Sequence, residues 1–191
     1  MTAEQLLSAC CAVSVCSIIC VSNKASLVVV VLDSHQDRLP QCGGLVPVLV
    51  IDGQPVAESE ATLDAIAELA PSLATPTPSK RQQWRDMLEQ RLIPVGKAAV
   101  LNPSSKNMAA LRVVIAEWEA KLRERPGKGH FLCGESLSIA DVSAVPFWSR
   151  LQEEMDCVGA EEFPLTHEWL AACRAREAVR RTQMSSWWWW W

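Results

Sequence analysis

The chain has 191 residues, of which 49% are apolar and 21% are charged, and its formal net charge is −4. This composition excludes an intrinsically disordered chain and leaves room for one large domain or two small ones. The absence of a long basic run argues against nucleic acid as the main partner.

The N-terminal segment is apolar and rich in cysteine. Residues 10–21 predict a helix that is buried nearly all round. The apolar stretch 6–21 follows Glu4 rather than basic residues and is short for a membrane span, so we expect neither a signal peptide nor a transmembrane helix. Eight cysteines, four of them within this one segment, favour reduced thiols in a cytosolic protein over a disulfide framework.

A group of strands comes next. Residues 26–32, with their run of valines, predict a fully buried strand in a parallel or central position. Residues 46–51 predict another strand, entered through Pro47, because proline cannot donate to a sheet in the middle of a strand. Asp52-Gly53 is a strong hairpin signal and leads into a short edge strand near 54–56.

Glu58 and Ser59 stand where the next helix begins. Apolar residues recur at helical spacing from there, which predicts a helix over 59–69. A serine at a helix N-terminus places a hydroxyl beside free backbone N–H groups, where an anionic ligand group could bind.

A stretch rich in Pro, Ser and Thr, residues 71–78, indicates a domain boundary. We therefore expect an α/β domain over residues 1–72, a linker over 73–79 and an all-α domain over 80–184. Residues 185–191 form a separate Trp-rich tail.

The second domain is predicted to be entirely helical. Ser79 is expected to cap a helix over 80–99 that Pro94 bends. Ser104 or Ser105 begins the next helix. Its apolar residues recur at intervals of three and four and form one stripe, namely Met108, Leu111, Ile115, Trp118 and Leu122.

Ser138 and Asp141 have the spacing of a capping box at the start of a further helix. The Ser138 hydroxyl can accept from the backbone N–H of Asp141, and the Asp141 carboxylate can accept from the backbone N–H of Ser138. Leu137 and Val142 flank the box in the positions of a hydrophobic staple.

Two sequence motifs together make the chain resemble the cytosolic glutathione transferase superfamily, in its omega-like, thiol-dependent reductase-like branch. They are the Gly-x-Val-Pro-Val-Leu strand with its Glu-Ser helix start, and the Phe-Leu-x-Gly-x-x-x-Ser-Ile-Ala-Asp box. The resemblance runs from about residue 24 to 182. It implies a thioredoxin-like glutathione-binding domain, with or without a regular first strand, and a C-terminal helical bundle. It also implies a structural role for Ser138 and Asp141.

The resemblance further implies a glutathione site. The Val46 backbone and Pro47 would bind the cysteinyl part, and Glu58 and Ser59 would hold the γ-glutamyl end. This chemistry is sensible, because a carboxylate suits a hydroxyl and helix N–H groups, whereas an ammonium group suits Glu58. By position alone, the second substrate would meet the helix after the linker, at Trp84, Met87, Leu88 and Arg91.

Cys11 is the candidate nucleophile, since it falls near the start of the first helix. A thiolate there would be stabilised by the helix dipole and could attack a glutathione mixed disulfide. Ser14 is the alternative, because serine-type members activate the thiol of glutathione with a hydroxyl hydrogen bond.

Two functions therefore remain open. One is a glutathione-dependent transferase or thiol transferase that acts on a small electrophile or a disulfide. The other is a non-catalytic binding or assembly module with a degraded active site. The resemblance implies a cytoplasmic protein and a homodimer. We expect no metal, because Cys16 and Cys20 share a helix face without a nearby His or a suitable fourth ligand.

Overall fold

The computed structural model describes residues 19–20, 27–30, 48–51, 54–125 and 127–182. Contacts between Cα atoms divide the chain into two compact units. The first contains Met1–Ala74 and Glu177–Met184, and the second contains Thr75–Arg176 and Ser185–Trp191. The division at Ala74 falls inside the linker predicted over residues 73–79. Residues 177–184, which contain α8 (Glu177–Thr182), group with the first unit rather than with the helical domain in which the sequence placed them.

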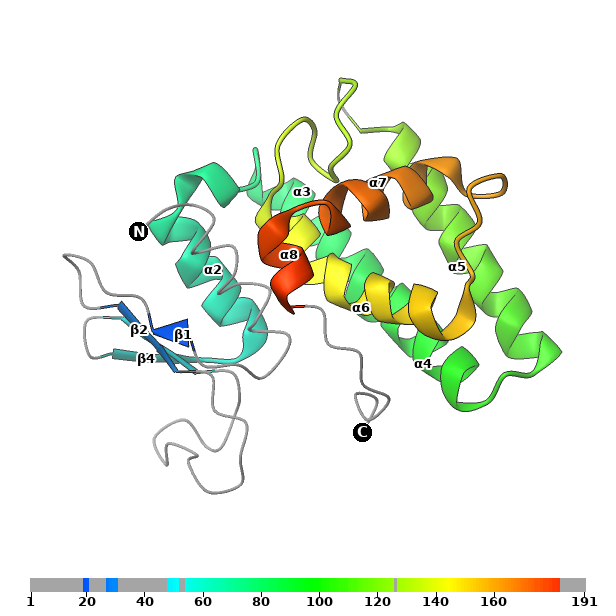
Figure 1. Ribbon diagram of the computed structural model, residues 1–191, viewed down its shortest axis with the longest axis horizontal. Helices are drawn as coiled ribbons and strands as arrows, with labels where there is room; N and C mark the ends of the chain where they lie inside the picture. The colour runs from blue at the N-terminus through cyan, green and yellow to red at the C-terminus, as the bar shows by residue number, and fades with distance from the viewer. Residues whose placement is uncertain (1–18, 21–26, 31–47, 52–53, 126, 183–191) are drawn as a thin grey trace. The chain divides into compact units, whose positions relative to one another are not determined.

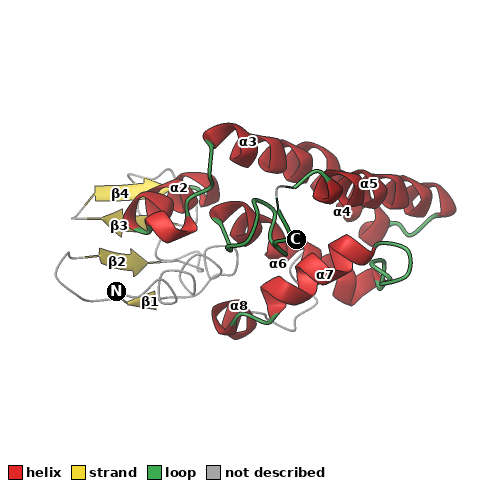
Figure 2. Ribbon diagram, turned by 90° about the horizontal axis from the view of Figure 1, so that it is seen from above, coloured by secondary structure: helices red, strands yellow, loops and turns green. Residues whose placement is uncertain are grey.

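The first unit contains a four-stranded sheet (Figure 1). Its strands lie in the order β1-β2-β3-β4 (Figure 2). Its strands are β1 (Ile19–Cys20), β2 (Leu27–Val30), β3 (Val48–Ile51) and β4 (Gln54–Ala57). All three pairings are antiparallel, and β3 pairs Val48 with Val30 on one side and with Ala57 on the other. Val48 and Leu49 are buried, so β3 is both an inner strand of the sheet and part of the core.

Most of the strand predictions are confirmed. The valine-rich stretch forms β2, which is central in the sheet but antiparallel to both neighbours. The hairpin is present, with Ile51 opposite Gln54, and Pro55 lies in β4 at the edge of the sheet, where a missing N–H costs least.

The helix predicted over 10–21 is wrong at its end, because Ile19–Cys20 is a strand that pairs with Val28 and Val29. A β-branched residue favours the extended backbone, and the neighbouring valine strand supplies the hydrogen-bonding partner that the prediction ignored. The remainder of that predicted helix, with Cys10, Cys11 and Cys16, lies outside the described residues.

Helix α2 spans Ser59–Leu69, as the sequence predicted, and contacts β3 and β4. Leu63 and Ile66, three residues apart, are buried together with Thr62. The last helical residue is Leu69, and Ala70 is the C-cap. The helix stops there because the next residue, Pro71, lacks an N–H and begins the short 3-10 turn Pro71–Leu73.

The second unit is all helical (Figure 2). Its helices are α3 (Pro78–Asp86), the π-helical segment η3 (Met87–Leu92), α4 (Ile93–Leu101), α5 (Ser105–Arg123), α6 (Ile139–Met155) and α7 (Pro164–Arg174). In the part of the chain that the structure describes, no helix combines the length and the apolar character needed to cross a bilayer.

The helix after the linker begins two residues earlier than predicted. The cap is Thr77, not Ser79, and its Oγ1 accepts from the backbone N–H of Lys80 at 3.4 Å. Pro78 is the first helical residue, where the absence of an N–H is harmless. Pro94 follows the π-helical turns of η3, and the backbone is right-handed helical at Leu92 and Ile93, so the proline does not end the helical run. The predicted bend at Pro94 stays a prediction. A π segment relieves the clash that the proline ring makes with the preceding turn.

Helix α5 is capped by Ser104, whose Oγ accepts from the N–H of Asn107 at 3.2 Å. The predicted apolar stripe is confirmed, since Leu111, Ile115, Trp118 and Leu122 are buried. Trp118 is the centre of an indole cluster. Its ring centroid lies 4.9 Å from that of Trp84, 5.2 Å from that of Trp148 and 5.6 Å from that of Trp169. Large aromatic side chains of this kind dominate the energy of a core.

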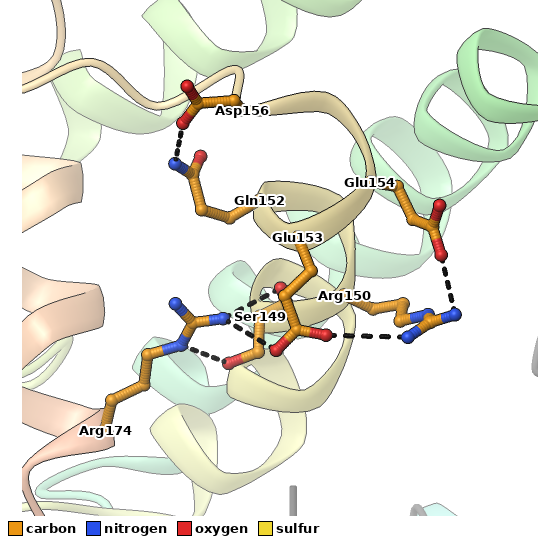
Figure 3. Close-up of polar contacts among 7 residues, drawn as sticks. All are labelled: Ser149, Arg150, Gln152, Glu153, Glu154, Asp156 and Arg174. Atoms are coloured by element: carbon orange, nitrogen blue, oxygen red, sulfur yellow. Dashed lines mark hydrogen bonds and ion pairs between the residues drawn. The ribbon is translucent and has the colours of Figure 1, made fainter. Parts of the chain in front are cut away.

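A polar cluster joins α6 to α7 (Figure 3). Arg174 donates through Nε to Ser149 Oγ at 3.1 Å, and through Nη2 to the Ser149 carbonyl at 2.9 Å and to Glu153 at 3.2 Å. Arg150 lies beside Glu153 and Glu154, with its closer contact to Glu154 at 2.6 Å. The planar fork of Arg174 can satisfy three acceptors at once, which fixes the two helices relative to each other.

Candidate functional site

Glu58 and Ser59 lie where the β4 strand meets helix α2. Ser59 is the first residue of the helix and Glu58 is its N-cap, and both side chains are exposed. The Glu58 carbonyl accepts from the N–H of Thr62 at 3.0 Å, and the Thr62 hydroxyl donates to the Ser59 carbonyl at 2.8 Å. Both main-chain positions are therefore held by bonds to the first turn of α2.

The backbone of Glu58 has φ 76° and ψ 146°. This left-handed φ is uncommon for a residue with a Cβ and carries strain that the surrounding structure must hold. The Glu58 side chain does not cap the helix. The first backbone N–H groups of α2 therefore have no side-chain cap, and they lie next to an exposed hydroxyl and an exposed carboxylate. Such a start suits a ligand that carries both an anionic and a cationic group.

The other predicted glutathione contacts, Val46 and Pro47, lie outside the described residues. The candidate nucleophile Cys11 and its alternative Ser14 also lie outside them. The structure therefore brings together Glu58 and Ser59 alone from the predicted glutathione site.

The four predicted substrate-pocket residues do not share one environment. Trp84 is buried in the indole cluster, and Leu88 is buried one turn further on. Met87 is half-buried. Arg91 is exposed and donates to both carboxylate oxygens of Glu117 on α5, at 2.6 and 3.2 Å.

The predicted capping box is present at the start of α6. Asp141 Oδ2 accepts from the Ser138 N–H at 2.8 Å and from the Ser138 hydroxyl at 2.7 Å. Its Oδ1 accepts from the Leu132 N–H and the Trp169 indole N–H, each at 2.8 Å. Burial raises the pKa of the Asp141 carboxyl, and these hydrogen bonds oppose the rise. One carboxylate thus joins a loop, the start of α6 and helix α7.

Glu119 is a buried acidic residue that sequence reasoning missed. It lies on α5 and accepts from the Leu165 N–H at 3.0 Å, and from the N–H and hydroxyl of Thr166 at 2.8 Å each. The N-cap of α7 is Phe163, which cannot cap a helix, so Glu119 satisfies the start of α7 in its place. The signal was present, because Glu119 follows Ile115 by one helical turn, on the buried face of α5.

Cys133, Cys157 and Cys173, in the helical unit, are not disulfide-bonded. Burial raises the pKa of Cys157 to about 11 and also raises that of Cys133. A raised thiol pKa opposes nucleophilic reactivity, since the thiolate is the reactive form. Among the described residues, no three His, Cys, Asp or Glu side chains are grouped to hold a metal ion.

The chain is similar to known proteins in both sequence and fold. Residues 96–177 match the family model "Glutathione S-transferase, C-terminal domain". The probable glutathione S-transferase parC of Nicotiana tabacum is 29% identical over 150 residues, which cover 72% of this chain and 66% of that protein. Glutathione S-transferase U7 of Arabidopsis thaliana is 25% identical over 171 residues, which cover 84% of this chain and 71% of that protein.

Solved structures share the fold over nearly the whole chain. The Tau class glutathione S-transferase of mango has a TM-score of 0.69 at 16% identity and covers 96% of this chain and 89% of its own. Rice GST1, solved in complex with glutathione, has a TM-score of 0.65 at 19% identity, and the match covers 95% of this chain and 86% of the rice chain. The predicted fold class is confirmed: a thioredoxin-like α/β unit precedes a helical unit of glutathione transferase type. The family model matches less than half of the chain, and these solved structures show the fold.

Proposed function

We propose that this protein is a glutathione-dependent transferase or thiol transferase. The observation that carries the proposal is the start of α2, where a strained Glu58 presents an exposed carboxylate beside the exposed Ser59 hydroxyl and the helix N-terminus. Strain of this kind persists at ligand-binding positions when the surrounding structure holds it. Glutathione would place its glutamyl carboxylate at Ser59 and the helix N–H groups, and its ammonium group at Glu58.

Two chemistries follow from the two candidate residues in the N-terminal segment. In the omega-like scheme, the Cys11 thiolate attacks the glutathione sulfur of a mixed disulfide and releases the other thiol, which takes up a proton. The thiolate of a second glutathione then attacks the Cys11 mixed disulfide, which yields glutathione disulfide and restores Cys11. In the serine scheme, the Ser14 hydroxyl donates to the glutathione thiolate, which attacks the electrophilic carbon, forms a C–S bond and expels the leaving group as its anion.

The relatives support the broader proposal. Both curated relatives bear the name glutathione S-transferase, and the rice structure contains glutathione. We also propose a cytoplasmic location, which the absence of a disulfide at Cys133 and Cys157 favours among the described residues. A homodimer remains a prediction.

Binding can be tested by capture on immobilised glutathione and by calorimetric titration. Glu58→Gln and Ser59→Ala should each weaken glutathione binding about tenfold, the effect of losing one charge-assisted hydrogen bond. Matched controls are Glu68→Gln on the outer face of α2 and Ser105→Ala, the first residue of α5. Both control residues are exposed, and both variants should bind as the wild type does.

Catalysis can be tested by hydroxyethyl-disulfide reduction and by conjugation of an aromatic electrophile. Loss of disulfide reduction in Cys11→Ala with normal activity in Ser14→Ala supports the thiolate scheme, and the reverse pattern in conjugation supports the serine scheme. A wild-type protein that neither binds glutathione nor shows either activity rejects the proposed function and leaves the non-catalytic module.

A further inference from the structure

A pocket of about 80 Å³ opens on the helical unit between the start of α3, the end of α5 and Leu132. Its walls carry three cations, Lys80, Lys121 and Arg125, against one carboxylate, Glu124. All of these residues belong to the second unit, so the pocket is built without any residue of the first.

The positive charge of this pocket is poorly compensated. Elsewhere on the helical unit, six arginines lie against carboxylates, namely Arg85, Arg91, Arg112, Arg123, Arg150 and Arg174. Within the described residues, neither Lys80 nor Lys121 forms an ion pair. Arg125 donates to the His130 carbonyl at 3.1 Å, which positions its guanidinium without neutralising it.

The pocket wall beneath these cations is rigid. The Lys121 ammonium lies 5.3 Å from the centroid of the Trp84 ring, a cation–π contact. Trp84 is only 5% exposed and is packed against Trp118. A cation that is held by a fixed ring needs little further ordering when a ligand arrives, and the apolar wall beneath it strengthens its attraction for an anion.

Lys80 adds the start of a helix to the same pocket. It is the third residue of α3, where the helix dipole is positive, and its N–H is turned toward Thr77 Oγ1. Burial raises the pKa of the nearby Cys133 thiol, the Ser138 hydrogen bond and the Lys80 charge lower it, and the Asp141 charge raises it further.

We propose that this pocket binds a small tetrahedral oxyanion, either free phosphate or sulfate or the same group on a small organic molecule. Lys80 and Lys121 supply the charge-assisted hydrogen bonds, and Arg125 completes the cationic rim. A volume of about 80 Å³ admits one such group but not a nucleotide or a peptide. Glu124 opposes binding and limits its strength.

The test is isothermal titration calorimetry of the full chain at low ionic strength, with inorganic phosphate and with phenyl phosphate. Saturable binding is expected. Equal affinity for the two probes identifies a free ion as the ligand, and tighter binding of phenyl phosphate identifies an organic carrier. Lys80→Gln and Lys121→Gln should each weaken binding about tenfold, whereas Glu124→Gln should tighten it several-fold.

Two further variants serve as controls for the loss of binding. Lys97→Gln removes an exposed lysine of α4 outside the pocket and should leave the affinity within about twofold. Lys121→Arg keeps both the charge and the contact with Trp84, so the proposal expects it to retain binding. No saturable binding of either probe, or an equal loss in Lys97→Gln, overturns the proposal. No glutathione is present, so this outcome is independent of the proposed catalysis.

Discussion

The indole N–H of Trp169 on α7 donates a 2.8 Å hydrogen bond to Oδ1 of Asp141 at the start of α6. The bond joins residues 28 positions apart in the sequence, and both side chains are fully buried. Because Asp141 also accepts from Ser138 and Leu132, its carboxylate is part of the tertiary structure as well as the cap of a helix.

Asp141→Asn should destabilise the protein by about 2–3 kcal/mol. An amide has one acceptor oxygen where the carboxylate has two, so at least one buried backbone N–H, of Leu132 or Ser138, would face an NH₂ group. Urea unfolding followed by circular dichroism measures the change in the free energy of unfolding.

The matched control for that variant is Asp156→Asn. Asp156 is exposed and has a left-handed backbone with φ 45°, which asparagine tolerates well. Asp156→Asn should change the free energy of unfolding by no more than about 0.5 kcal/mol. Equal effects of the two substitutions would contradict a special role for the buried carboxylate.

Glu119→Gln should also destabilise the protein, by about 1–3 kcal/mol, because the start of α7 would lose an acceptor for Leu165 or Thr166. Thr166→Val removes only the hydroxyl donor. A double-mutant cycle of the two substitutions should reveal a coupling energy of at least about 0.5 kcal/mol.

Glu117→Gln, two residues away, serves as the control for Glu119→Gln. Glu117 pairs with Arg91 at the surface, so its loss should cost about 1 kcal/mol or less. Strictly additive effects of Glu119→Gln and Thr166→Val would show that the two side chains do not act as one cap.

Gly129→Ala should destabilise the helical unit by about 2 kcal/mol or more. A Cβ at Gly129 would lie 2.0 Å from the backbone oxygen of Gly134, and a backbone neighbour cannot turn away as a side chain can. Gly159→Ala is the comparison, because nothing lies within 4 Å of its new Cβ. Thermal unfolding should show a clearly lower Tm for the Gly129 variant only, and an unchanged Tm for both would refute the close approach.

Cys157 should resist alkylation at neutral pH. Burial raises its pKa to about 11, so the thiol stays protonated, and the thiolate fraction at pH 8 is on the order of 0.1%. The alkylation rate should rise about tenfold for each pH unit up to about pH 10. Pulsed iodoacetamide labelling with mass spectrometry of the Cys157 peptide measures this rate. The same peptide in the urea-unfolded protein should react much faster at pH 8, and equal rates would contradict the raised pKa.

The sequence allowed prediction wherever a local signal decides the structure. The apolar spacing after Ser59 located α2, and the Ser138–Asp141 spacing located the start of α6. Prediction was wrong where a residue's conformation depends on a partner that is distant in the sequence. Ile19–Cys20 is extended because a valine strand pairs with it, which helical periodicity cannot reveal.

The same limit applies to the candidate site. Glu58 and Ser59 could be found from their place before an amphipathic helix, but the left-handed φ of Glu58 could not, since glutamate rarely adopts it. Glu119 was missed because its partners lie 46 and 47 residues away. Trp84 was assigned to a substrate pocket from its position in the sequence alone. The sequence did not reveal that Trp84 packs against Trp118, the contact that buries it.

The indole cluster around Trp118 gives the helical unit an optical signature. The rings of Trp84, Trp148 and Trp169 each lie 4.9–5.6 Å from that of Trp118, so excitation energy can pass between neighbouring rings before light is emitted. The indole N–H groups of Trp118 and Trp148 have no hydrogen-bond partner among the described residues, and such an apolar setting shifts emission to shorter wavelength. The emission of these four buried rings should therefore shift to the red when this core loosens, and the five tryptophans of residues 187–191 add their own emission to the total.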